Sequence, residues 1–206
     1  MAIQDVTVRQ FIEDIGSSAP TPGGGSVAAL TASSAAALIE MVANLTIGKE
    51  KFQAVEVEMK QVQATTGELK QRFLTMIDED CAAFNEIMAA YKLPKTSDEE
   101  KAARSLAIQE ASKNAALAPF KIGEVAMSLF DLAAAVIERG NPMLVTDGAV
   151  AVLNTRAAVK SAFLNVKINL GAIKDGDFVS GLQKRMAEME ELADTREKEL
   201  MGKISL

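Results

Sequence analysis

AVEVEMKQVQATTGELKQRFLTMIDEDCAAFNEIMAAY, residues 54–91, is a very long stretch with helical spacing, and it decides the fold class. Its apolar or small side chains alternate at steps of three and four, the spacing of a seam between packed helices. These positions are Val55, Met59, Val62, Thr66, Leu69, Phe73, Met76, Phe84, Ile87 and Tyr91. A step of four from Met76 reaches Asp80, which breaks the pattern. We predict one helix over 54–91, ended by Leu93-Pro94.

The rest of the chain also favours helices, at about 6–15, 26–45, 97–118, 147–170 and 178–201. Ser97 followed by Glu100 is a capping-box pattern. Pro119 is predicted to kink or break its helix, with the chain continuing helically to about 138. Alternating runs of β-branched residues are nearly missing. The expected fold is all-α, a bundle of about six long helices in a single domain over residues 1–206.

Composition excludes several classes of protein. A net charge of -6 argues against a broad nucleic-acid surface. The weakly polar stretch 27–39 is too short and too polar to span a membrane, and no signal-peptide pattern is present. The chain has one cysteine, Cys81, so an intrachain disulfide is impossible and a reducing cytoplasm is expected. Histidine is absent, so Ser-His-Asp triads and His-rich metal sites are excluded. Because there is a single cysteine, Cys-rich metal sites are excluded too, and no metal site is predicted.

A glycine-rich segment is the first candidate binding site. Pro20-Thr21-Pro22-Gly23-Gly24-Gly25-Ser26 opens directly into a predicted helix. Glycines adopt backbone conformations closed to other residues, and a helix N-terminus carries a positive dipole end. Together they suit an anion or a tightly held planar ligand. The alternative is a flexible turn capped by Ser26.

A second candidate is the polar segment 44–52, with Asn44, Thr46, Lys49 and Lys51 at the end of a predicted helix. Its alternative is structural, because Gly48 is a plausible C-cap and lysines near a helix C-terminus are favourable in any protein.

Asp80 is a third candidate, since a carboxylate within an apolar seam is costly unless paired, and burial can raise its pKa into a range useful for proton transfer. The alternative is that the seam drifts and leaves Asp80 at a wet end of the bundle. Cys81 fits a buried small apolar residue better than a nucleophile.

A fourth group comprises Asn141 in the loop Gly140-Asn141-Pro142, Asp147 at the start of the next helix, and Asn165 and Asn169 one turn apart. Asparagine is a poor helix former, so this pair among apolar residues suggests a polar lining. Asp147 alternatively serves the helix dipole, and the asparagines alternatively form hydrogen bonds between helices.

Four segments together resemble the formimidoyltetrahydrofolate cyclodeaminase family: APTPGGGSVAAL, NLTIGKEKF, DEDCAAFNEIMAAYKLPK and RGNPMLVTDGAVAVL with NVKIN. The stretch AYKLPKTSDEEKAAR is most similar to stand-alone bacterial methenyltetrahydrofolate cyclohydrolases. Thr146-Asp147-Gly148 stands where relatives often have Ser-Asp-Ala, which keeps the acid. The formiminotransferase domain of some animal relatives is not expected here.

The resemblance implies an all-helical fold, self-assembly through helix packing, and folate bound near the glycine-rich segment. The expected reaction is hydrolysis of 5,10-methenyltetrahydrofolate to 10-formyltetrahydrofolate without a cofactor. The alternatives are a cyclodeaminase that releases ammonia and a non-catalytic folate-binding protein. A polyglutamylated folate would bring carboxylates to Lys49, Lys51 or Lys95.

The candidate catalytic groups are Asp80 or Asp147, with Lys49 as electrostatic partner. The candidate substrate-binding residues are Pro22, Gly23, Gly24, Gly25, Ser26, Asn44, Thr46, Lys51, Lys95, Asn141, Asn165 and Asn169. We also expect a homodimer or larger assembly, because a helix of about 57 Å exceeds a compact domain with a radius of gyration of about 17 Å.

Overall fold

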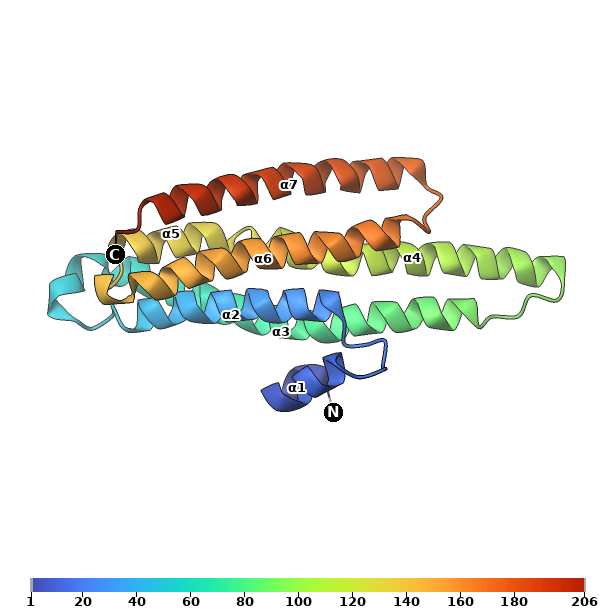
Figure 1. The fold of residues 1–206 in the computed structure, drawn as a ribbon, viewed down its shortest axis with the longest axis horizontal. Helices are drawn as coiled ribbons and strands as arrows, with labels where there is room; N and C mark the ends of the chain where they lie inside the picture. Colours follow the sequence, from blue (N-terminus) through green and yellow to red (C-terminus); the bar gives the residue numbers. More distant parts are fainter. Residues whose placement is uncertain (1, 206) are drawn as a thin grey trace.

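Seven α-helices and three short 3₁₀ helices make up the computed structural model, which describes residues 2–205 and contains no strand within that range. The α-helices are α1 (Val8–Ile15), α2 (Gly24–Asn44), α3 (Glu56–Tyr91), α4 (Asp98–Ala126), α5 (Leu129–Arg139), α6 (Val145–Leu170) and α7 (Gly176–Gly202). The 3₁₀ helices are Ile3–Asp5, Glu50–Val55 and Pro142–Leu144. The all-α prediction is confirmed: α1 is short, and the other six helices form an elongated bundle (Figure 1).

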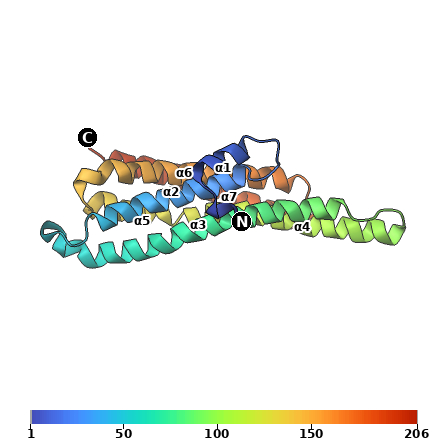
Figure 2. The ribbon, with the colours of Figure 1, turned by 90° about the horizontal axis from the view of Figure 1, so that it is seen from below.

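The bundle is built around α2, which packs against α3 and α6, while α4 packs against both α3 and α6. Helix α7 lies on the outside of α6 and α5 (Figure 1). The hairpin of α3 and α4 extends beyond the other helices at one end of the molecule. Helix α1 lies across the bundle near its middle (Figure 2), where Phe11 packs into the core.

Helix α2 is the central helix because its side chains are small. Ala28, Ala29, Ala32, Ala35 and Ala36 are fully buried, which lets neighbouring helices approach closely. The helix extends beyond the predicted 27–39 stretch, and by length and composition its 21 residues are enough to cross a membrane. More than half of its apolar window is buried inside the bundle, as in a core helix.

The predicted seam of α3 is real in its first half, where Met59, Val62, Thr66, Phe73 and Met76 are buried. Beyond Met76 the buried positions move one residue along the chain, to Ile77 and Cys81. An α-helix turns 100° per residue, so a straight helix drifts away from a strict 3–4 repeat. Asp80 therefore borders the core rather than lying in its centre.

Pro119 was predicted to kink or break the helix that begins after Ser97, and the break is wrong: α4 runs through Pro119 to Ala126. The chain breaks instead at Met127 and Ser128. A proline has no N–H for the carbonyl four residues earlier, which here belongs to Ala115. The side-chain amide of Asn169 donates to that carbonyl at 2.7 Å. The lost backbone bond is thus replaced from α6.

Several helix ends differ from the predicted bounds by one or two residues. Helix α2 begins at Gly24 rather than Ser26, so two of the three glycines form its first turn. Helix α6 begins at Val145, and α7 begins after the side-chain cap Asp175. The capping box of Ser97 and Glu100 is present as predicted.

Candidate active site

A cavity of about 320 Å³ opens at the N-terminal end of α2, and we call it the glycine pocket. The segment before α2 and the first turn of this helix contribute much of the wall, and α3, α4 and α6 supply the rest. Its lining comprises Pro20, Thr21, Gly23, Gly24, Gly25, Asp80, Phe84, Ala115, Asn165, Ile168 and Asn169. The pocket thus brings together the predicted residues Gly23, Gly24, Gly25, Asp80, Asn165 and Asn169. The predicted residue Pro22 is buried beside this lining.

The glycines are needed for close approach and not for unusual backbone angles. Within residues 2–205 only Gly48 has a positive φ, of 75°, so the expected special conformation of the glycine-rich segment is wrong. A Cβ on Gly25 would lie 2.6 Å from Asp80 Cγ. A Cβ on Gly24 would lie 2.9 Å from both amide atoms of Asn165. The two glycines therefore let side chains of α3 and α6 reach the backbone of α2.

Asp80 is the acidic group of the glycine pocket. The Ser26 hydroxyl donates to Asp80 Oδ2 at 3.0 Å. Burial raises the pKa of Asp80 above its ordinary value, while hydrogen bonds from the Ser26 hydroxyl and backbone act in the opposite direction. The carboxylate also lies at the N-terminal end of α2, whose dipole favours a negative charge. Asp80 is therefore a partly desolvated carboxyl group facing a cavity, which suits proton transfer.

Asn165 and Asn169 face the same pocket with defined amide orientations. The amide NH₂ of Asn165 donates to the Ser161 carbonyl at 2.8 Å, and that of Asn169 donates to the Ala115 carbonyl at 2.7 Å. Hydrogen bonding between helices, the alternative weighed for this pair, is thus real for Asn169. Because each NH₂ is directed at a backbone carbonyl, each Oδ1 remains an acceptor for donors on a ligand.

Cys81 is buried with its thiol 3.3 Å from the Ser26 hydroxyl. Burial raises the pKa of this thiol, which keeps it protonated at neutral pH. This environment agrees with the structural interpretation of Cys81 and disfavours a nucleophilic role.

The second group of predicted residues lies at the other end of α2, about 30 Å away along a helix of 21 residues. We call it the distal end; its predicted residues are Asn44, Thr46, Lys49, Lys51, Asn141 and Asp147. Thr46 is buried and accepts a hydrogen bond from the Asn141 N–H at 2.9 Å. The Asn141 amide donates to the Leu45 carbonyl at 3.3 Å. These contacts join the end of α2 to the loop before α6.

The lysines and the acid of the distal end lie apart from the glycine pocket. Lys49 and Lys51 are exposed, and Asp147 is half-buried in the first turn of α6. The predicted pairing of Lys49 with Asp80 is therefore contradicted within one chain, because the two residues lie at opposite ends of α2. Sequence order did not reveal this separation, since it depends on which ends of the helices meet.

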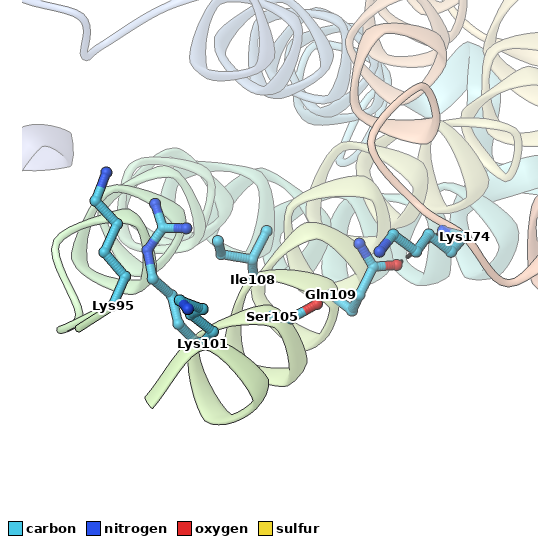
Figure 3. Close-up of a pocket in the computed structure, with 7 residues that line it drawn as sticks. Lys95, Lys101, Ser105, Ile108, Gln109 and Lys174 are labelled. Atoms are coloured by element: carbon cyan, nitrogen blue, oxygen red, sulfur yellow. Dashed lines mark hydrogen bonds between the residues drawn. The ribbon is translucent and has the colours of Figure 1, made fainter. Parts of the chain in front are cut away.

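Lys95 lies neither at the glycine pocket nor at the distal end. It lines a basic pocket of about 360 Å³ between the start of α4 and the loop before α7 (Figure 3). The pocket is lined by Lys95, Lys101, Arg104, Ser105, Ile108, Gln109 and Lys174. Gln109 ties the loop down, because it donates to the Ala172 carbonyl and accepts from the Lys174 N–H at 2.7 Å. No acidic side chain is part of this lining.

Some pocket residues were not among the predicted site residues. Phe84 was predicted only as a residue of the seam. Ala115 and Ile168 have apolar side chains that do not by themselves indicate a binding site. The side chain of Ile168 is 78% exposed, which a helical pattern of alternating apolar residues does not indicate. Within residues 2–205, no group of three or more Cys, Asp or Glu side chains is arranged as a metal site would require. Metal independence nevertheless remains a prediction.

Comparison with known proteins assigns the chain to a family. The family model described as Formiminotransferase-cyclodeaminase matches residues 7–188, most of the chain. The chain belongs to the formiminotransferase-cyclodeaminase family. The glycine pocket and the distal end both lie within the matched residues, whereas the end of α7 lies outside them.

Members of the formiminotransferase-cyclodeaminase family differ in length and in the activities that their names describe. The chain is 44% identical over 186 residues to a methenyltetrahydrofolate cyclohydrolase of Methylorubrum extorquens, covering 90% of this chain and 88% of that protein. It is 30% identical to the formimidoyltransferase-cyclodeaminase of Rattus norvegicus, covering 98% of this chain but only 38% of the rat protein. The solved structure of a formiminotetrahydrofolate cyclodeaminase from Thermotoga maritima superposes with a TM-score of 0.81 at 29% identity, covering 98% of this chain and 94% of that one.

Proposed function

We propose that this chain hydrolyses 5,10-methenyltetrahydrofolate to 10-formyltetrahydrofolate. The observation that carries the proposal is Asp80, a partly desolvated carboxylate that faces the glycine pocket within a chain 44% identical to a methenyltetrahydrofolate cyclohydrolase. The methenyl group is part of a cationic amidinium, so an acidic pocket attracts the substrate. Ring opening removes the positive charge of the amidinium, so this attraction weakens when the product forms.

The chemistry requires one water and releases one proton. Water adds to the methenyl carbon, and Asp80 accepts the proton that the attacking water loses. The remaining hydroxyl proton of the adduct passes to N5 as the bond from this carbon to N5 breaks, which leaves N5–H and a formyl group on N10. Holding water, carboxylate and carbon together removes much of the entropic cost of the reaction. No metal or redox cofactor takes part in these steps.

The remaining lining suits a flat ligand with polar edges. Phe84 and Ile168 provide apolar surface, and Asn165 and Asn169 offer carbonyl acceptors to ring N–H groups. Gly23, Gly24 and Gly25 present backbone and no side chain of their own to the ligand.

The basic pocket is the proposed site for the glutamyl carboxylates of a polyglutamylated substrate. Helix α4 connects the two pockets, because Ile108 lines the basic pocket and Ala115 lines the glycine pocket. Residues seven apart lie on one face of a helix, about 10 Å from each other. Among the described residues, Lys95 and Lys174 have no carboxylate within ion-pair distance, so their charges are available to a ligand.

We also propose that the chain forms a homodimer through an apolar face of α6. Val150, Leu153, Leu164 and Ile168 recur at helical spacing on this face and are exposed, Leu164 by 64%. A two-fold axis across α6 would set two such helices antiparallel. The distal end of each chain would then lie beside the glycine pocket of its partner, which would bring Lys49 and Asp147 to the site.

The proposed setting is a single cytoplasmic domain. One hydrophobic core includes residues from α1 to α7, which supports the single domain. Cys81 is a free thiol, which suits a reducing compartment.

Two assays test the proposed reaction against its rival. Methenyltetrahydrofolate loses its near-ultraviolet absorbance on hydrolysis, and we expect this loss with purified protein in the presence of a chelator. Activity that disappears with the chelator and returns with a divalent ion would contradict metal independence. Cyclodeaminase chemistry is favoured by the name of the Thermotoga maritima protein. Release of ammonia from formimidoyltetrahydrofolate at much higher efficiency would establish that reaction instead, and binding without either turnover would indicate a non-catalytic folate-binding protein.

The assembly has its own test. Light scattering should give a dimer for the parent chain, and Leu164→Glu should shift it toward the monomer while preserving helical content. A parent chain that remains monomeric at assay concentration would refute the dimer.

A further inference from the structure

Ser26 is fully buried and contacts two neighbouring side chains of α3. Its hydroxyl oxygen lies 3.0 Å from Asp80 Oδ2 and 3.3 Å from Cys81 Sγ. Ser26 was predicted to bind substrate, but its hydroxyl is directed at these two groups and the residue is not part of the pocket lining. Ser26 is the third residue of α2 and follows Gly25, whose missing Cβ leaves room for Asp80 to come close.

The direction of the two hydrogen bonds follows from what each group can donate. An ionised carboxylate only accepts, so the single hydroxyl proton of Ser26 goes to Asp80. The Cys81 thiol, which burial keeps protonated, then donates to the Ser26 oxygen. The result is a chain from thiol to hydroxyl to carboxylate. A hydrogen bond to an ionised acceptor is stronger than one between neutral groups.

Within residues 2–205, no Lys or Arg side chain forms an ion pair with Asp80. Helix α2 faces it with Gly25 and Ser26, α4 contributes Ala115 to the pocket, and α6 contributes Asn165 and Asn169. None of these groups titrates. On α3 the titratable neighbours of Asp80 in sequence are Asp78, Glu79 and Cys81, and Asp78 accepts a hydrogen bond from the Ile3 N–H. Hydrogen bonds from Ser26, together with the dipole of α2, therefore favour the charged form.

We infer that Ser26 is the positioning residue of the glycine pocket, holding the Asp80 carboxylate in its ionised form and in a fixed orientation against the first turn of α2. The inference rests on the proposed function, in which Asp80 accepts a proton. Without the Ser26 hydroxyl, one of the hydrogen bonds that stabilise the ionised carboxylate is lost. Asp80 then keeps its proton to a higher pH. A protonated carboxyl cannot act as the base, so activity is lost first on the acid side.

The test is the pH dependence of kcat/KM for the parent, Ser26→Ala and Ser33→Ala. Ser33 is a matched control because it is a buried serine of the same helix whose hydroxyl donates to the Lys70 carbonyl, away from the pocket. We expect the acid limb of Ser26→Ala to move up by about one pH unit, the scale of one charge-assisted hydrogen bond, with activity recovering at higher pH. Ser33→Ala should keep the parent limb.

A ¹³C NMR titration of the Asp80 carboxyl in ligand-free protein separates this inference from the proposed reaction. The same upward shift should appear there even if the parent does not turn over the substrate, in which case only the proposed function fails. If the titration midpoint of Asp80 is unchanged in Ser26→Ala, or moves equally in Ser33→Ala, the positioning role of Ser26 is overturned. If Ser26→Ala does not fold, Ser26→Cys retains a weak donor in nearly the same volume and should give a smaller shift in the same direction.

Discussion

The two ends of α2 carry polar residues of similar kinds, yet the structure uses them differently. At the distal end, Thr46 and Asn141 direct their polar atoms at each other and at backbone groups. At the glycine pocket, Asp80 and Asn165 reach past Gly25 and Gly24 and border open space. The distal end therefore holds a loop junction together within one chain, whereas the glycine pocket leaves acceptors free for a ligand.

This difference shows that a polar residue in an apolar pattern indicates a binding or catalytic role only when some of its donor or acceptor atoms have no partner within the protein. Asn169 illustrates both cases, since its NH₂ replaces the backbone bond that Pro119 removes and its Oδ1 remains for the pocket. Four predictions test the contrast between the two ends, beginning with the largest expected effect.

Asp80→Asn should lower the turnover rate by about a hundredfold or more, because the amide cannot accept the proton. Helical content, measured by circular dichroism, should be unchanged. Asp147→Asn is the comparison at the distal end. A similar loss there, with substrate hydrolysis as the readout, would show that the distal end of a partner chain completes the site. If both variants turn over at the parent rate, carboxylate catalysis is wrong.

Gly25→Ala should reduce kcat/KM by about tenfold or more, because the new Cβ occupies the place of the Asp80 carboxyl group and displaces it. Gly181→Ala is the control, since a Cβ there meets no atom within 4 Å. It should stabilise α7 by about 0.5–1 kcal/mol in urea unfolding and leave kinetics unchanged. Normal kinetics in Gly25→Ala would show that the close approach of Asp80 to α2 has no role in the reaction.

Thr46→Val should lower the free energy of unfolding by about 1–3 kcal/mol, because the buried Asn141 N–H loses its acceptor. The measurement is urea denaturation. Thr31→Val changes a hydroxyl within α2 that bonds only to the Val27 carbonyl, and it should stay within about 0.5 kcal/mol of the parent. An undiminished stability in Thr46→Val would mean that the distal junction is not held by this bond.

The smallest effect concerns the stability of the ligand-free protein and its pH dependence. The pKa of Asp80 in the folded chain lies above its ordinary value of 3.8, so the folded state binds the proton more tightly than the unfolded state. The stability that Asp80 contributes is present at low pH and is lost as pH rises from this ordinary value through the folded value. Asp80→Asn should therefore raise the free energy of unfolding at neutral pH relative to the parent and lose this advantage in acid. A destabilised Asp80→Asn at neutral pH would contradict this sign.

Several residues of the candidate site could be identified from the sequence, but which of them lie together in the fold could not. Asp80 stands out because it interrupts the seam of 54–91, and the glycines stand out because three occur together before a helix. The roles of Gly25 and Gly24 depend on Asp80 and Asn165, which lie 55 and 141 residues further along the chain and belong to no local pattern. Phe84 and Ile168 line the pocket because α3 and α6 bring them beside the first turn of α2.

By itself, the sequence determined the all-α class, the capping box at Ser97 and Glu100, the first half of the α3 seam and the absence of histidine chemistry. These depend on spacing and composition, which are local properties of the chain. The tertiary structure alone decided that α4 passes through Pro119, because the Ala115 carbonyl finds its donor on α6. It also decided that Asp80 and Lys49 lie at opposite ends of α2, since the direction and register in which helices pack determine which residues meet.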